Sequence, residues 1–79
     1  MSKEKIETCI ADSLNQYFKD LEGVAPHNLY SMVMCHVERP LFAIVLEKAG
    51  GNQSKAAQWL GLSRNTLHKK LIELGLLHD

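Results

Sequence analysis

The stretch Gly51–Leu71, GNQSKAAQWLGLSRNTLHKKL, most constrains how this chain can fold. Its apolar residues repeat at helical spacing in two short segments, first Ala56, Ala57 and Leu60, then Leu67, Leu71 and Leu74. Between the segments, Gly61 can take the left-handed conformation that ends a helix, and Ser63 can cap the next helix by accepting a backbone N–H. The paired alanines allow close packing of two helices. The stretch therefore predicts a helix-turn-helix unit, a motif whose second helix lies in the major groove of DNA.

The charges of this part of the chain support the same interpretation. No Asp or Glu occurs between Lys48 and Ile72, and the basic residues there are Lys48, Lys55, Arg64, Lys69 and Lys70. The whole chain has nine basic and nine acidic residues, so its neutral balance hides a segregated charge. A basic segment without acids is typical of a phosphate-binding surface. The alternative is a helical hairpin with a solvated basic face.

Two helices are predicted before this unit, and the second is unusually apolar. The first begins near Ile6, with apolar residues at helical spacing, and ends at Gly23, while His27 or Asn28 can cap the second. The second, about Leu29–Ala49, is apolar on nearly every side and contains Pro40, which predicts a kink rather than a break. At ~1.5 Å per residue it would span about 30 Å, more than its neighbours in one chain can cover. We therefore expect a homodimer with a four-helix core, the alternative being a compact monomer.

The chain is predicted to be a single all-α domain, residues 1–79, with dimerisation helices at 6–49 and the helix-turn-helix unit at 51–75. Its charged start has no apolar signal region, and its longest apolar run, Leu41–Leu46, is too short to cross a bilayer. Cys9 and Cys35 lack the paired spacing of a metal site, which fits free thiols in the cytosol. Residues 1–5 are expected to fray. No membrane, metal, cofactor or small-molecule ligand is expected.

Several motifs closely resemble the Fis family of bacterial nucleoid-associated proteins, which share their helix-turn-helix with the C-terminal domain of NtrC-type activators. The matching residues are NQYF with L-x-G (Asn15–Gly23), NLY (Asn28–Tyr30), VE-x-PL (Val37–Leu41), GNQ-x-x-AA (Gly51–Ala57) and G-x-x-R-x-TL-x-KKL (Gly61–Leu71). The resemblance implies an intertwined homodimer that binds degenerate DNA sites, bends the duplex and regulates transcription in the bacterial nucleoid. Because the dimerisation helices match as well, a stand-alone protein is favoured over an NtrC-type fragment.

The resemblance also implies which residues contact DNA. Carried over by position, they are Asn52, Ser54, Lys55, Ser63, Arg64, Thr66, Lys69 and Lys70, and the exposed face of the second helix adds Asn65 and His68. Arg64, in the first helical turn, can bond the O6 and N7 atoms of guanine. Short polar side chains near helix N-termini can donate to phosphates, and the lysines can release counterions.

The chain departs from the family pattern at several of these positions. Ser63 replaces a common Asn, His68 replaces a basic residue, and Ile72 and Glu73 replace familiar lysines, so weaker DNA binding is expected. The short start, MSKEKIETC, has no counterpart of the hairpin arm that stimulates DNA invertases, and that activity is not expected.

Other function classes find less support in the sequence. An enzyme is not expected, because no nucleophile, base and orienting group come together, and Cys35 and His36 diverge as neighbours on a helix. The alternative is a protein-interaction module that docks on a transcription complex with little DNA affinity of its own. Both roles could coexist if the region Gln58–Gly61 contacts RNA polymerase, as in Fis relatives. Trp59 is expected to pack against neighbouring helices rather than stack on a base.

Overall fold

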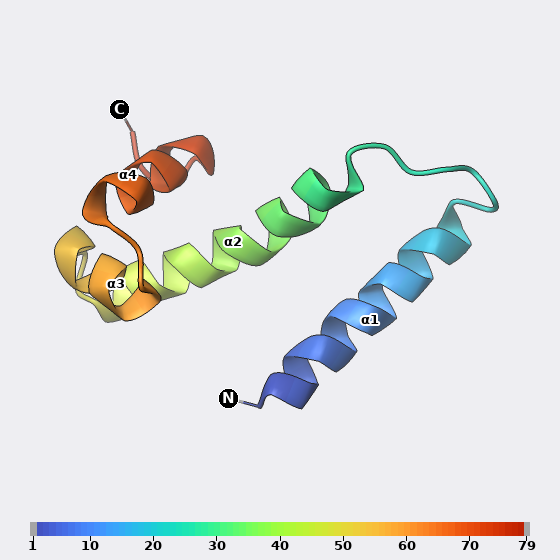
Figure 1. Ribbon diagram of the computed structural model, residues 1–79, viewed down its shortest axis with the longest axis horizontal. Coiled ribbons are helices and arrows are strands. Elements are labelled where there is room, and N and C mark those ends of the chain that lie inside the picture. Colours follow the sequence, from blue (N-terminus) through green and yellow to red (C-terminus); the bar gives the residue numbers. More distant parts are fainter. Residues whose placement is uncertain (1, 79) are drawn as a thin grey trace.

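The protein is a chain of four helices, seen in a computed structural model that describes residues 2–78. In order they are α1 (Lys3–Asp20), α2 (Leu29–Lys48), α3 (Gln53–Leu60) and α4 (Arg64–Glu73) (Figure 1). No strand occurs in the described part, and the predicted all-α fold is confirmed. Both α3 and α4 lie within the predicted helix-turn-helix unit, residues 51–75.

The first helix begins earlier than the sequence predicted. The Ser2 hydroxyl oxygen accepts the backbone N–H of Lys5 at 3.4 Å, and this cap allows α1 to start at Lys3 instead of near Ile6. The expected fraying of residues 2–5 is therefore wrong, while Met1 lies outside the described residues. The apolar pattern could not reveal this turn, because its side chains are charged and exposed.

The connection into α2 also differs from the prediction. Asn28 precedes the helix in a left-handed conformation (φ 51°, ψ 37°) and makes no capping hydrogen bond with its side chain, so the predicted cap is wrong. Asn is one of the few residues that tolerate this conformation. As predicted, α2 then continues through Pro40 without interruption.

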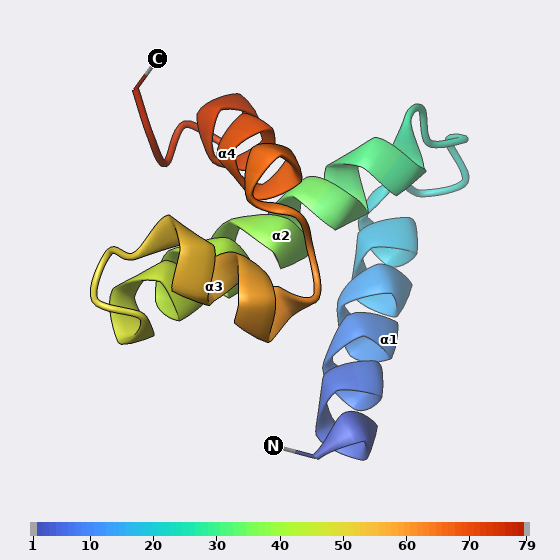
Figure 2. The ribbon, with the colours of Figure 1, turned by 60° about the vertical axis from the view of Figure 1, so that its left-hand side comes forward.

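The buried core lies entirely at the C-terminal end of the molecule. There α3 packs on both α2 and α4 (Figure 2). Ala56, Leu67 and Leu71 are completely buried, and the small alanines allow α4 to approach α3 closely. The full core comprises Phe42, Ala49, Ala56, Ala57, Leu67, Leu71 and Leu74. This core joins the end of α2 to the helix-turn-helix unit.

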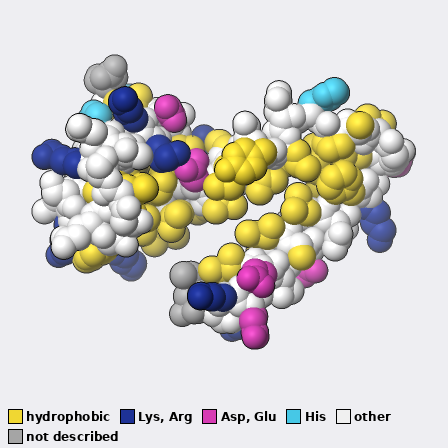
Figure 3. Space-filling model, in the orientation of Figure 1, with side chains coloured by type: hydrophobic (Ala, Val, Ile, Leu, Met, Phe, Trp, Pro, Cys, Tyr) yellow, Lys and Arg dark blue, Asp and Glu magenta, His cyan; other side chains and the backbone are white. Residues whose placement is uncertain are grey.

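Both α1 and α2 carry apolar side chains that the rest of the chain leaves largely uncovered. No residue of α1 is buried, and Phe18 on α1 and Ile44 on α2 keep 48% and 53% of their surface exposed. An apolar groove between the helices is lined by Ile10, Leu14, Tyr17, Met32, Val33 and Val37. The side chains of both helices that face this gap are predominantly hydrophobic (Figure 3). A single chain thus leaves much of its apolar surface exposed to water.

Within the part of the chain that the structure describes, one helix, α2, is long and apolar enough to cross a membrane by length and composition alone. The uninterrupted apolar run Leu41–Leu46 alone is too short to indicate this. Core helices of soluble proteins satisfy the same criterion when other helices surround them. The charged side chain of Glu38 at the middle of α2 is engaged in an ion pair with Lys70 of α4, which fits a helix covered by protein.

Candidate nucleic-acid interface

The turn between α3 and α4 has the geometry that the sequence predicted. Gly61 is left-handed (φ 76°), and its N–H donates to the carbonyl of Gln58, while the N–H of Leu62 donates to the carbonyl of Ala57 at 2.9 Å. These two bonds close α3 in a Schellman motif. Leu62 then packs against the core, one residue before the cap of α4.

Two predicted contact residues cap the helices of this unit. Asn52 Oδ1 accepts the backbone N–H of Lys55 at 3.0 Å at the start of α3, and Ser63 Oγ accepts that of Thr66 at 3.2 Å at the start of α4. Each cap leaves other backbone N–H groups of the first turn without a partner inside the helix. Both helix N-termini therefore retain the donors and the positive end of the dipole that favour a phosphate.

A side-chain hydrogen bond links Ser63 directly to Thr66. The Ser63 hydroxyl donates to Thr66 Oγ1 at 2.8 Å, in addition to its capping role. Thr66 therefore accepts from Ser63 and keeps its own hydroxyl hydrogen for another acceptor. A donor that is itself accepting a hydrogen bond is polarised, which strengthens its bond to an anion. Both residues were predicted as DNA contacts, whereas the hydrogen bond between them was not.

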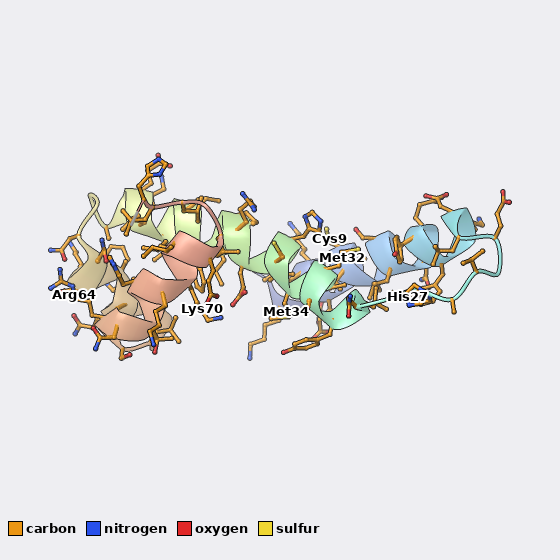
Figure 4. All side chains as sticks on the ribbon, turned by 90° about the horizontal axis from the view of Figure 1, so that it is seen from above. Cys9, His27, Met32, Met34, Arg64 and Lys70 are labelled. Atoms are coloured by element: carbon orange, nitrogen blue, oxygen red, sulfur yellow. The ribbon has the colours of Figure 1, made fainter. Side chains whose placement is uncertain are left out.

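The outward face of α4 presents the remaining polar residues together. Arg64, Asn65, His68 and Lys69 are all exposed, and Arg64 extends from the outer end of the helix (Figure 4). His68 Nδ1 lies 3.1 Å from Gln53 Oε1 on α3. Since an amide oxygen accepts, Nδ1 is the donor in the tautomer that makes this bond. Gln53 thus orients His68, a role that the sequence analysis missed.

On α3, Lys55 is held near an exposed aromatic ring. The Lys55 ammonium lies 5.2 Å from the ring centroid of Trp59, one helical turn later, in a cation–π contact. Trp59 keeps 54% of its surface exposed, so the expectation that it packs between helices is wrong. Ser54 is exposed in the first turn of the same helix. Lys55 and Ser54 are therefore both accessible.

Among the predicted contact residues, Lys70 differs in being partly buried and paired with an acidic side chain. Its ammonium forms an ion pair with Glu38 Oε2 of α2 at 2.9 Å, and its side chain is only 34% exposed. The hydrogen bond to the Glu38 carboxylate raises the pKa of Lys70 above its ordinary value, more than burial lowers it. In Figure 4 the labelled Lys70 lies between α4 and α2, apart from Arg64.

The charge of the surface is segregated as the sequence indicated. Dark blue Lys and Arg side chains gather around the α3–α4 end, and others lie at the two ends of α1, where magenta Asp and Glu side chains accompany them (Figure 3). Within residues 2–78, no group of three or more His, Cys, Asp or Glu side chains could hold a metal ion. Cys9 and Cys35 are free thiols. The chemistry of this end is that of an anion-binding surface.

Two helices with capped N-termini, a tight glycine turn and an exposed basic second helix define the class of helix-turn-helix DNA-binding proteins. A family profile described as "Bacterial regulatory protein, Fis family" matches residues 36–74. The chain belongs to the Fis family, as the motifs predicted, and is a DNA-binding regulatory protein rather than an enzyme.

Similar proteins are found over nearly the whole chain. A Fis-like DNA-binding protein of Neisseria meningitidis serogroup A is 58% identical over 72 residues, which cover 91% of each chain. One from Ralstonia nicotianae is 54% identical over 77 residues, 98% of this chain and 100% of the relative. The DNA-binding protein Fis of Proteus mirabilis is 36% identical over 76 residues, 96% of this chain and 78% of the relative. The similarity includes the two N-terminal helices as well as the helix-turn-helix unit.

Proposed function

We propose that the protein is a homodimer that binds DNA with broad sequence tolerance, bends it, and acts as a nucleoid-associated transcriptional regulator in the bacterial cytoplasm. The observation that carries the dimer is the uncovered apolar surface of α1 and α2. Within its own chain α1 has no buried residue. The apolar side chains of Ile6 and Phe18 on α1, and of Leu41 and Ile44 on α2, are exposed to solvent. At about 25 cal/mol per Å2, exposing so much apolar surface would be costly. Pairing with a second copy in a four-helix core would bury it.

The proposed DNA contacts divide into one base-reading residue and several phosphate-binding residues. Arg64 would bond guanine in the major groove, since it is exposed in the first turn of α4. The phosphate-binding group comprises Asn52, Ser54, Lys55, Ser63, Asn65, Thr66, His68 and Lys69, which surround the two helix N-termini or the outward face of α4. Many of these contacts would go to the phosphate backbone of DNA. The protein would therefore tolerate many sequences and distinguish sites mainly by how easily the DNA deforms.

Sedimentation analysis together with fluorescence anisotropy would test this proposal. The protein is expected to sediment as a dimer, and Ile44→Glu, which places a charge on the exposed apolar face, is expected to shift it toward monomer. On a duplex of about 27 base pairs with G/C edges and an A/T-rich centre, Arg64→Ala should cost on the order of 1–3 kcal/mol. A monomeric wild type would refute the dimer, and absence of saturable binding at moderate salt would refute direct DNA binding by the isolated protein.

A second candidate function is favoured by the exposed end of α3. Gln58 and Trp59 are both exposed, and a large exposed aromatic side chain is typical of a protein contact. We propose RNA polymerase as a partner of this surface, in agreement with the family resemblance. Trp59→Ala should then reduce promoter activation while DNA affinity falls by less than it does in Arg64→Ala. If both variants lose DNA affinity equally, Trp59 acts on DNA instead.

A further inference from the structure

The ion pair between α4 and α2 sets Lys70 apart from every other basic residue of the helix-turn-helix unit. Lys70 Nζ and Glu38 Oε2 are 2.9 Å apart, and the two side chains are 34% and 21% exposed. No second salt bridge joins any of the residues from 2 to 78. Lys69, the adjacent lysine, is exposed and has no such partner there. Two neighbouring lysines of one motif therefore have different surroundings.

The location of the pair explains what it can do. α4 packs mainly on α3, which in turn packs on α2, so the direct connection between α4 and α2 is limited. Lys70 lies beside the buried Leu71, and Glu38 lies one helical turn before the buried Phe42. The ion pair therefore closes the edge of the core where α4 crosses α2. It restricts how α4 can rotate or slide relative to α2.

The electrostatics of Lys70 also argue against a phosphate contact. Glu38 already neutralises the ammonium at hydrogen-bond distance, and Glu73 adds a further negative charge nearby. To bind a phosphate, Lys70 would have to leave a partly buried carboxylate unpaired, which costs free energy. Lys69 can bind a phosphate without that cost.

We infer that Lys70 is a positioning residue, which fixes the recognition helix on the dimer core through Glu38 and does not contact DNA phosphate. This inference rests on the proposed dimeric DNA-binding function. In the dimer, the angle between α4 and α2 sets the separation of the two recognition helices. The pair therefore contributes to the half-site spacing that the dimer accepts, and hence to its specificity for DNA shape.

The salt dependence of DNA binding distinguishes a positioning lysine from a phosphate-binding one. Each phosphate contact contributes about 0.9 to the slope of log K against log salt, so a lysine lost from both subunits should lower its magnitude by about 1.8. The full-length protein would be titrated with the duplex described above, as wild type, Lys69→Gln and Lys70→Gln. We expect the loss of about 1.8 for Lys69→Gln and a change below about 0.5 for Lys70→Gln. Equal losses in the two variants would overturn the inference.

A charge exchange provides a test that general destabilisation cannot imitate. Lys70→Glu alone would place two carboxylates together and is expected to weaken binding at least tenfold. Combining it with Glu38→Lys restores an ion pair of opposite polarity, and binding should return to within about threefold of wild type. If Lys70 contacts phosphate, the double variant would bind no better than Lys70→Glu, and the inference would fail. If circular dichroism shows that the exchange variants do not fold, the salt slope of DNA binding by Lys70→Gln is the test of the inference.

A panel of duplexes with different half-site separations examines the positioning role itself. Wild type and Lys69→Gln should prefer the same separation. In Lys70→Gln, the difference in log affinity between the preferred separation and the others should fall by at least half. An unchanged preference in Lys70→Gln would refute a positioning role. Failure of the proposed function is distinguishable, because wild type would then show no saturable, salt-dependent binding to any duplex.

Discussion

Replacing Ser63 by Ala should separate helix capping from DNA contact. The substitution removes the oxygen that accepts the Thr66 N–H at 3.2 Å, together with the hydroxyl that donates to Thr66 Oγ1 at 2.8 Å. Loss of an N-cap costs typically ~1 kcal/mol, and the exposure of Ser63 places this site near that value. For a domain of this size, a loss of 1 kcal/mol lowers Tm by about 4–8 °C.

DNA affinity should also fall, because Thr66 loses the hydrogen bond that orients its hydroxyl. A neutral hydrogen bond contributes about 0.5–1.5 kcal/mol, so weakening one per subunit should cost about 1 kcal/mol in the proposed dimer, roughly a fivefold change in Kd. The salt slope should not change, since no charge is removed. Thermal unfolding by circular dichroism and anisotropy at 25 °C, well below Tm, would measure the two effects independently.

Ser63→Asn is the matched control for this substitution. Asn caps helices as well as Ser, so Tm should stay close to that of wild type. Its amide can also donate to DNA, and the affinity should equal or exceed that of wild type. The reasoning is refuted if Ser63→Ala melts within about 1 °C of wild type, or if Ser63→Asn loses as much stability as Ser63→Ala.

Three further predictions concern the core, the charge of α4 and pH. Leu67 is completely buried, so Leu67→Ala should cost about 2–5 kcal/mol in urea unfolding, whereas Leu67→Met should cost less than about 1.5. His68→Arg adds a permanent charge on the exposed face and should steepen the salt slope of DNA binding by up to about 1.8 per dimer, with His68→Gln as the neutral control. Because the pKa of Lys70 is raised in the folded protein, its ion pair stabilises fully below the ordinary lysine pKa and is lost as pH rises through the raised value. The Tm difference between wild type and Lys70→Gln should thus be constant from about pH 8 to 10 and shrink at higher pH, and a difference that grows there would contradict the pairing.

The helix-turn-helix unit was predictable from sequence because its signals are local. Gly61 and Ser63 act within four residues of their own position, as the left-handed turn and as a cap, and the structure confirms both. The paired alanines and leucines likewise follow one helical period. Capping failed as a predictor at Asn28, which adopts a left-handed conformation and leaves its side chain uncommitted. An Asn supports both behaviours, and composition cannot choose between them.

Contacts between distant parts of the chain could not be predicted from the sequence. Gln53 and His68 are 15 residues apart, and Glu38 and Lys70 are 32 residues apart. Their pairing depends on how α3 and α4 cross each other and α2, which no local pattern specifies. Trp59 was misjudged for a related reason, since it keeps 54% of its surface exposed on the same short helix as the buried Ala56 and Ala57. The candidate residues were therefore predictable, but their mutual arrangement was not.

This arrangement bears on how a chain without net charge can bind DNA. If Lys70 is committed to Glu38, each subunit offers Lys55, Arg64 and Lys69 as the basic groups of the proposed interface. Six such groups in a dimer would give a salt slope of at most about −5, whereas counting Lys70 as well would give about −7. Glu38 thus lowers the non-specific part of the affinity while it holds the recognition helix at a defined angle. Specificity depends on the difference between correct and incorrect sites, so an ion pair that removes phosphate attraction and adds rigidity favours selective binding over packaging of DNA.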